Sequence, residues 1–209
     1  MRTLIFLLII GLTPLLLCSQ IYIEPAAGYQ FDVNNDHSRH FNSELRFSFK
    51  KGKLYEFMLK VQKSWPVSSG YVDSSFSVNP NLPLYSPANK TIHTSSFSIA
   101  AGNRFKVLGM RSKNSLFVTI FTGVAFQQFD VSYKYDKANY TILNPDQTAK
   151  EGGLFVTGGL GYMRQLKNSR FIFEINIASP PAAKINYPSS FNLMSPLSFN
   201  IGYSIRIKK

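Results

Sequence analysis

The stretch that decides the fold reads Leu197-Ser198-Phe199-Asn200-Ile201-Gly202-Tyr203-Ser204-Ile205-Arg206-Ile207. Its odd positions carry apolar or aromatic side chains, and its even positions carry small or polar ones. A helix would scatter those apolar side chains around its circumference, because its period is 3.6 residues. A strand has a period of two and places all of them on one face. The stretch therefore predicts a β-strand with one apolar face and one polar face.

The same two-residue alternation recurs along the rest of the chain. Phe173 and Ile175, for example, flank Glu174 in another such segment. The alternation is less regular in residues 115–130, which are apolar on both faces, and in residues 153–166. Together with the last stretch, the segments predict eight strands. The other seven are residues 21–30, 44–49, 55–62, 91–106, 115–130, 153–166 and 170–177.

The connections between these segments alternate in length. Lys51-Gly52-Lys53 and Lys167-Asn168-Ser169 have the composition of tight hairpin turns, and residues 107–114 are intermediate. Short turns at one end and long loops at the other are typical of a membrane-spanning barrel. The sequence therefore predicts an all-β fold, an eight-stranded antiparallel up-and-down transmembrane β-barrel. Its long loops, expected outside the cell, are residues 32–40, 64–90, 131–152 and 179–195.

The N-terminal segment has the layout of a secretory signal peptide. Arg2 precedes a nearly unbroken apolar run from Leu4 to Leu17, and small or polar residues follow. The run is short for a membrane helix, and Pro14 interrupts it. We expect cleavage near Ser19 or Gln20. This divides the chain into a signal peptide, residues 1–20, and an outer-membrane β-barrel domain, residues 21–209.

The single cysteine of the chain, Cys18, lies inside this predicted signal. Leu17 precedes it where lipid attachment normally needs a small residue, so a lipoprotein is the less favoured alternative. Once the signal is removed, no disulfide and no thiolate metal site can form. The later sequence has no apolar stretch long enough for a membrane helix. If the mature chain lies in a membrane, it must do so as a closed barrel.

The position of the charges says more than the formal net charge of +12. An exported chain rarely meets nucleic acid, so we expect no nucleic-acid partner. Four of the five glutamates fall at the polar parity of their strands, where an ionised carboxylate avoids hydrocarbon. The interior of an eight-stranded barrel has room for side chains or one small ligand. Charged side chains in this interior can form a structural plug, or they can gate a path for protons or small solutes. We favour the plug. The predicted lumen ion-pair network is Glu24, Glu44, Arg46, Glu56, Lys60, Arg104, Glu174 and Arg206.

Basic and aromatic side chains gather near the ends of the segments. A basic rim at the short-turn end can contact anionic lipid head groups or simply keep the turns soluble. We assign to it Lys50, Lys51, Lys53, Lys106, Arg111, Lys113, Arg164, Lys167, Arg170, Lys208 and Lys209. Aromatic side chains at strand ends predict interfacial girdles. These are Tyr22, Tyr55, Trp65, Tyr133, Tyr135, Tyr162 and Tyr203.

The last strand also carries a motif. Asn200, Gly202, Ile205 and Ile207 follow the order polar, any, Gly, any, any, apolar, any, apolar. This resembles the β-signal that barrel-assembly machinery recognises, although the chain ends on lysines rather than on an aromatic residue.

With the signal peptide and the eight segments, the mature chain resembles the small eight-stranded outer-membrane β-barrel proteins of Gram-negative bacteria, the OmpA-like and OmpX-like class. The resemblance implies insertion into the cell outer membrane by that machinery, among outer-membrane lipids. Members serve adhesion, envelope stabilisation, secretion accessory roles or lipid modification, and the fold alone does not choose among them.

Few residue groups suggest chemistry. His93 and Ser95 lie on the same side of a predicted strand, as a lipid-modifying barrel would require, but the sequence places no acid to orient the histidine. The glycines of residues 158–161 lie inside a strand, where they make room for neighbouring side chains rather than bind phosphate. We predict no catalytic residue, no cofactor and no metal. The one group with metal-ligand character lies in a loop, where such side chains are usually solvated: Asp32, Asp36, His37 and His40.

The sequence therefore favours a non-enzymatic outer-membrane barrel with a plugged, ion-paired interior. Its exposed loops, residues 64–90 and 131–152, are expected to contact a surface partner or to support envelope stability. One alternative is a deacylase-like, lipid-modifying barrel that uses His93. Another is a soluble periplasmic lipocalin-like barrel that binds a small hydrophobic ligand and buries its apolar face. The alternation alone does not show which face lies inside.

Overall fold

The structure of the chain is a computed structural model that describes residues 20–31, 39–65, 69–109, 112–143, 147–178, 184–185 and 197–208. Apart from Gln20, the predicted signal peptide lies outside these residues, so the division of the chain at residue 20 stays a prediction. No helix in the described part of the chain is long and apolar enough to cross a membrane. The strands are β1 (Gln20–Phe31), β2 (Arg39–Lys51), β3 (Tyr55–Trp65), β4 (Ser69–Ser77), β5 (Tyr85–Leu108), β6 (Asn114–Lys134), β7 (Tyr140–Thr141), β8 (Gln147–Gln165), β9 (Ser169–Ala178), β10 (Lys184–Ile185) and β11 (Leu197–Lys208).

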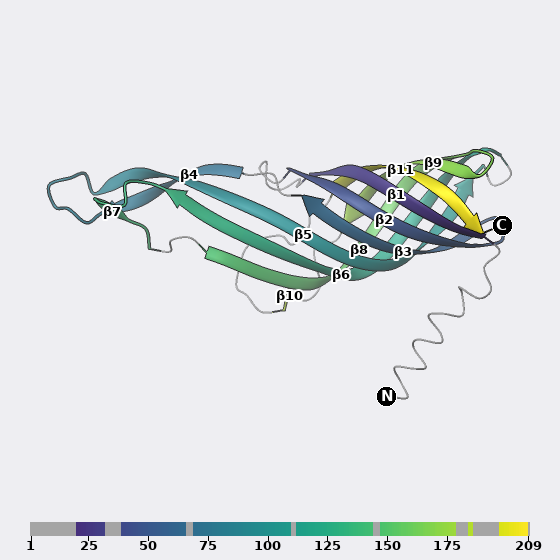
Figure 1. Cartoon of the computed structure of the whole chain (residues 1–209), viewed down its shortest axis with the longest axis horizontal. Helices are drawn as coiled ribbons and strands as arrows, with labels where there is room; N and C mark the ends of the chain where they lie inside the picture. Colours follow the sequence, from purple (N-terminus) through teal and green to yellow (C-terminus); the bar gives the residue numbers. More distant parts are fainter. Residues whose placement is uncertain are drawn as a thin grey trace, which may run out of the picture.

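Eight of these strands form a closed ring. Starting from β1, antiparallel pairing passes through β2, β3, β5, β6, β8, β9 and β11 and returns to β1. Each ring strand covers one of the eight predicted segments to within one residue, so the predicted eight-stranded antiparallel barrel is confirmed. A closed ring leaves no free sheet edge, which is the condition for placing strands in hydrocarbon. Figure 1 shows the barrel at the end of the molecule that carries the C-terminus.

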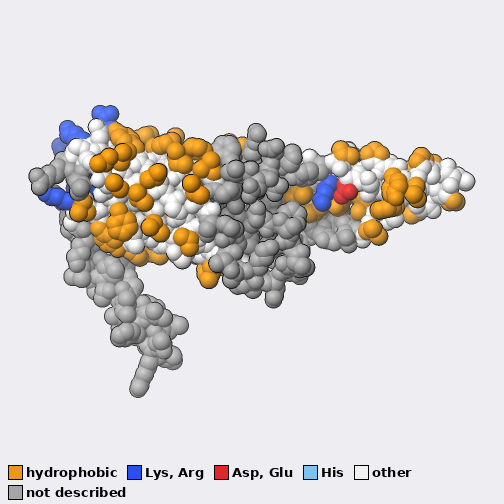
Figure 2. Space-filling view, turned by 180° about the vertical axis from the view of Figure 1, so that it is seen from behind, with side chains coloured by type: hydrophobic (Ala, Val, Ile, Leu, Met, Phe, Trp, Pro, Cys, Tyr) orange, Lys and Arg blue, Asp and Glu red, His pale blue; other side chains and the backbone are white. Residues whose placement is uncertain are grey.

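The barrel wall is polar inside and apolar outside. Buried and exposed residues alternate along the whole of β3. Glu56 and Lys60 are buried, whereas Leu59 and Val61 are exposed. Hydrophobic side chains cover the visible outer wall of the barrel in Figure 2. The soluble lipocalin-like alternative requires the opposite arrangement and does not fit the structure.

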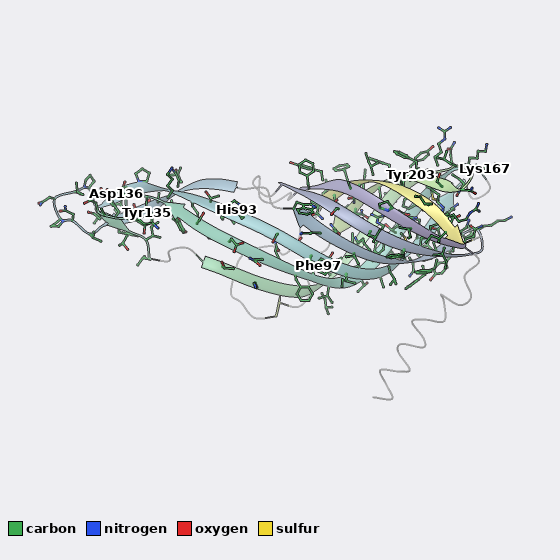
Figure 3. The ribbon with its side chains drawn as sticks, viewed as in Figure 1. His93, Phe97, Tyr135, Asp136, Lys167 and Tyr203 are labelled. Atoms are coloured by element: carbon green, nitrogen blue, oxygen red, sulfur yellow. The ribbon has the colours of Figure 1, made fainter. Side chains whose placement is uncertain are left out.

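The short turns lie together at the C-terminal end of the barrel (Figure 1). Lys51 pairs with Tyr55 across the β2–β3 turn, and Gly52 has a φ of 79°. Glycine adopts this left-handed conformation without a steric cost. Gly109, with a φ of 71°, follows the end of β5 in the same way. Lys167, labelled in Figure 3, marks the β8–β9 turn at this end.

Three barrel strands continue well beyond the barrel. β3 ends at Trp65, whereas the pairing of β5 with β6 continues outward as far as Asn89 and Lys134. β4 pairs with this extension of β5, and β7 pairs with β4. In Figure 1 the resulting sheet points away from the barrel at the end opposite the short turns. We call this sheet the arm and define it as residues 69–95, 128–143 and 147–150.

The prediction that residues 64–90 and 131–152 are loops is therefore wrong for most of their length. They contain β4, β7 and the outer parts of β5, β6 and β8. The arm lies beyond the apolar belt, so neither of its faces has to be apolar, and polar side chains occupy both parities. The two-residue alternation that reveals the barrel strands is lost for that reason. Of the other two predicted long loops, most residues lie outside the described part of the chain.

Candidate functional sites in the lumen and the arm

Carboxylates and guanidinium groups meet inside the barrel. The buried arginines, each at most 1% exposed, are Arg46, Arg104 and Arg170. Arg46 of β2 contacts three carboxylates. It pairs with Glu24 of β1 at 3.2 Å, with Glu44 of its own strand, and with Glu174 of β9. Arg46 is therefore a hub that connects three barrel strands.

The other two arginines extend these contacts across the lumen. Arg104 pairs with Glu24 at 2.7 Å and with Glu56 at 3.3 Å. Arg170 pairs with Glu56 at 2.7 Å, and the Ser48 hydroxyl donates a hydrogen bond to the same carboxylate at 2.8 Å. Because Glu24 and Glu56 are each shared, the ion pairs form one connected network. It links β1, β2, β3, β5 and β9.

Lys60 of β3 shares the lumen with this network. Its side chain is almost fully buried, as are the four carboxylates and three guanidinium groups. The Lys60 Nζ lies 4.6 Å from the centroid of the Phe121 ring, and the Arg104 guanidinium carbon lies 4.6 Å from the centroid of the Phe117 ring. Cations over the faces of aromatic rings are favourable contacts. Ion pairs and aromatic rings together occupy this level of the lumen.

The network joins the barrel strands to one another and leaves none of its carboxylates free for catalysis. Each of its four carboxylates accepts a hydrogen bond from a guanidinium group, and Glu174 also accepts one from the Thr119 hydroxyl of β6. A general base needs a carboxylate that is free to take a proton from a substrate. These four carboxylates are instead engaged with the barrel wall, where their pairing offsets the cost of burying charge.

Arg206 does not join the network, and that prediction is wrong. The Arg206 Nη2 donates to the carbonyl oxygen of Lys167 at 3.4 Å and to the Asn168 side chain. Both partners belong to the β8–β9 turn. Arg206 has inward parity, but it lies near the end of β11, where its side chain reaches the rim of the barrel rather than the centre. The other seven predicted network residues lie in the lumen.

Two further predictions are wrong: Arg170 is not a rim residue, and Tyr22 is not a girdle residue. Arg170 is buried in the network, and its guanidinium carbon lies 3.4 Å from the centroid of the buried Tyr22 ring. Parity carries the missing signal, because Arg170 shares the face of Glu174 four residues later. The position of Arg170 directly after a turn argues for the rim, but its long side chain reaches back into the lumen.

The remaining rim and girdle residues follow the barrel more closely. Lysine and arginine side chains gather at the barrel end away from the arm in Figure 2. Tyr55, Trp65, Tyr162 and Tyr203 are exposed on the outer wall. Tyr133 and Tyr135 belong to the arm instead, and Figure 3 shows Tyr135 far from the barrel. Their prediction as interfacial residues is wrong because β6 extends past the end of the barrel.

Glycines on the lumen side make room for large interior side chains. A Cβ at Gly161 would collide with the ring of Phe117, which is 1% exposed and packs beneath Arg104. Gly158 belongs to the same strand but faces the outer wall, and a Cβ added there would have no atom within 4 Å. Gly161 therefore makes room for a lumen side chain, whereas Gly158 faces outward and makes room for none.

Gly161→Ala is expected to lower the free energy of unfolding by about 1–3 kcal/mol, because overpacking displaces Phe117 from beneath Arg104. Gly158→Ala is the matched control and is expected to be neutral or stabilising by about 0.5 kcal/mol, since alanine restricts the unfolded chain. Urea titration of the barrel in lipid vesicles measures both changes. Equal effects of the two substitutions would contradict the packing role of Gly161.

The four residues of the predicted β-signal lie in β11, whose pairing with β1 closes the ring. Asn200 and Gly202 are buried on the lumen side, and Ile205 and Ile207 are exposed on the outer wall. Recognition of this strand by assembly machinery stays a prediction.

An acid lies beside the histidine of the arm. Asp130 of β6 is the register partner of the exposed His93 of β5. The Asp130 carboxylate accepts hydrogen bonds from the Thr148 hydroxyl at 2.9 Å and from Gln128 Nε2 at 3.1 Å. Ser95 lies two positions from His93 on the same strand. No local pattern indicates this acid, because the neighbour depends on the pairing register of two long strands.

The described residues contain no group of three His, Cys, Asp or Glu side chains that could hold a metal ion. Asp32, Asp36 and His37 of the predicted loop group lie outside the described part of the chain, and only the backbone of His40 is described.

Comparison with known proteins identifies the fold through solved structures. No family model matches the sequence, and no curated protein matches it. A major outer membrane protein of Thermus thermophilus is 10% identical, aligns over 90% of this chain and 99% of its own, and has a TM-score of 0.51. OprG from Pseudomonas aeruginosa is 11% identical over 92% and 98%, with a TM-score of 0.50. Ail of Yersinia pestis, in complex with the heparin analogue sucrose octasulfate, is 10% identical over 90% and 97%, with a TM-score of 0.49. The ring of eight strands, its apolar outer wall and the first two of these similarities show that this chain has the fold of the small outer-membrane β-barrel proteins.

Proposed function

We propose that this chain is a non-enzymatic outer-membrane barrel that holds its arm outside the cell for contact with a surface partner. The observation that carries the proposal is the unbroken pairing of β5 with β6 and of β6 with β8 from the barrel into the arm. At about 3.3 Å per residue, residues 85–95 extend about 35 Å past the end of β3. Sealing a membrane requires no such projection, whereas contact with a partner beyond the lipid surface does.

The tip of the arm supports this role. The hairpin between β4 and β5 is ordered by backbone hydrogen bonds, among them Ser77 N to Leu84 O at 2.9 Å and Val78 N to Asn139 O at 2.9 Å. Its exposed apolar side chains are Val78, Leu82, Leu84 and Tyr85. A cluster of apolar side chains on a water-exposed, ordered turn is typical of a binding surface. Tyr135 and Asp136 lie in the same outer part of the arm in Figure 3.

The lumen supports a plugged barrel rather than a conducting one. An eight-stranded barrel encloses just enough space for side chains. Here that space holds the ion-pair network and the buried rings of Phe117 and Phe121. The barrel then acts as a closed anchor in the membrane that holds the arm beyond the lipid surface.

The proposal is tested on living cells, with a cysteine at one of two positions in a chain whose only natural cysteine is Cys18 of the predicted signal. Asn81→Cys lies at the arm tip, and Lys167→Cys lies in a short turn. A membrane-impermeant maleimide is expected to label the first on intact cells and the second only after the outer membrane is permeabilised. The opposite labelling pattern would overturn the proposed orientation.

Partner contact is tested by a photo-crosslinking amino acid at position 84. It is expected to yield a discrete cross-linked species on intact cells, and Val78→Ser with Leu82→Ser is expected to reduce the yield. The same amino acid at position 53, in a short turn, is the control. Identical cross-linked species from both positions would contradict contact through the arm.

One observation favours a second candidate, a lipid-modifying barrel. The register places Asp130 beside His93, as a histidine base would need for its orientation. Ser95, on the same strand, is the nearest candidate nucleophile in sequence. This candidate predicts altered lipid A in cells that overexpress the protein and unaltered lipid A with His93→Ala. Unaltered lipid A mass spectra in both cases would remove it.

A further inference from the structure

A groove lies on the outer wall where the arm leaves the barrel. Register pairing places Lys63, Phe97, Phe126 and Gly152 in one row across the neighbouring strands β3, β5, β6 and β8. The groove encloses about 510 Å³, within the range of about 300–1,000 Å³ that ligand sites occupy. Gly152 leaves space beside the Phe126 ring, which a Cβ would approach to 3.3 Å. Phe97, labelled in Figure 3, marks this place at the base of the arm.

A polar row borders the aromatic row on its arm side. Ser95, Gln128 and Lys150 are register partners on β5, β6 and β8, and all three line the groove. Lys63 and Lys150 are exposed and come from the two outermost of the four strands. The Lys63 Nζ lies 4.2 Å from the centroid of the Trp65 ring, which holds this cation at the groove. The groove is therefore cationic on both sides and aromatic between them.

The groove also lies on the boundary between the apolar belt and the arm. On the barrel side, Ile99, Val124 and Leu154 are register partners with exposed apolar side chains. On the arm side, the next row contains His93 and Asp130. In a bilayer, the polar head groups, which carry the phosphates, follow the hydrocarbon core in the same order. The order of the rows thus matches the order of chemical groups in a lipid.

We propose that this groove binds a phosphorylated lipid with several acyl chains from the outer leaflet of the membrane. Its phosphates pair with Lys63 and Lys150, and the Ser95 hydroxyl donates a hydrogen bond to a phosphate or sugar oxygen. Its acyl chains lie against the two phenylalanine rings and the apolar belt below them. A free phosphate would leave those rings uncovered, so the groove is matched to the whole amphiphile. The proposal rests on the proposed orientation of the arm outside the cell.

The test uses the mature protein refolded in detergent micelles, with native mass spectrometry to count bound lipid. The probes are bis-phosphorylated hexa-acyl lipid A, the same lipid without its phosphates, and inorganic phosphate as a competitor. The groove variant is Lys63→Gln with Lys150→Gln. The matched control removes the same charge from exposed positions of the arm, as Lys134→Gln with Lys137→Gln. Heat-dependent gel mobility confirms that each variant is folded.

Each lysine at a membrane surface is worth about a 5-fold change in affinity, so the groove variant is expected to bind bis-phosphorylated lipid A about 30-fold more weakly. The control variant is expected to bind like the natural chain, and removal of the phosphates is expected to weaken binding to the natural chain. Equal binding by the groove and control variants would overturn the proposal. Displacement of the lipid by inorganic phosphate at comparable concentration would assign the groove to free phosphate instead.

The outcomes separate this site from the proposed function. A chain that displays its arm on cells but shows no phosphate-dependent lipid binding would overturn the groove alone. Labelling of the short turns rather than the arm on intact cells would overturn the orientation, and with it both proposals.

Discussion

Arg46→Ala is expected to lower the free energy of unfolding of the barrel by about 3–5 kcal/mol, the cost of breaking a buried ion pair by removing one partner. Arg46 is the hub of the lumen network and contacts Glu24, Glu44 and Glu174. Without it, Glu24 keeps its contact with Arg104, but the buried carboxylates of Glu44 and Glu174 lose their guanidinium partner. Urea titration in lipid vesicles, followed by heat-dependent gel mobility, measures the change.

Two further variants show whether the loss comes from unpaired charge. Arg206→Ala removes an arginine of the same parity that lies at the rim, and it is expected to cost less than about 1 kcal/mol. Arg46→Met with Glu44→Leu removes one positive and one negative charge together, and it is expected to be more stable than Arg46→Ala. If Arg46→Ala costs no more than Arg206→Ala, the network does not clamp the barrel.

Leu160→Arg is expected to lower the free energy of unfolding by about 2–4 kcal/mol, because it places a cation against the hydrocarbon of the bilayer. Leu160 is 67% exposed on the outer wall, and its register partners are Val118 of β6 and Ile175 of β9. In a water-soluble protein a leucine this exposed would tolerate arginine. The cost of the substitution therefore shows whether lipid or water surrounds the barrel. Urea titration in lipid vesicles measures this change in the free energy of unfolding.

Leu143→Arg supplies the matched control for the surroundings. Leu143 is 80% exposed, but it lies in the arm beyond the barrel. Because the arm is surrounded by water, this substitution is expected to change the stability by no more than about 0.5 kcal/mol. Similar costs at positions 143 and 160 would mean that the apolar outer wall does not lie in hydrocarbon.

The barrel could be predicted from the sequence because hydrocarbon enforces a strict pattern. A strand with lipid on one side and a packed polar lumen on the other must alternate, as residues 197–207 do, and the eight segments follow. The arm could not be predicted in the same way. β4 and the outer half of β5 meet no hydrocarbon, so nothing in their composition separates a paired strand from a loop.

The lumen network shows a similar division. Parity placed Glu24, Glu56 and Arg46 inside, because charge is excluded from the lipid side. Parity alone does not tell how far along the barrel a long side chain reaches. Arg170 begins beside a turn and reaches inward, while Arg206 has inward parity and remains at the rim. The partner of His93 required the β5–β6 register, which no local pattern encodes.

The continuous pairing of β5, β6 and β8 has a mechanical consequence. A pull on the arm tip acts along the strand axes, and hydrogen bonds between antiparallel strands are perpendicular to those axes. The pull therefore loads the hydrogen bonds of the β5–β6 and β6–β8 ladders in shear, many at once, instead of opening them one after another. Tension from a bound object passes through these ladders into the wall of the barrel, so the arm and its anchor resist detachment as a single unit.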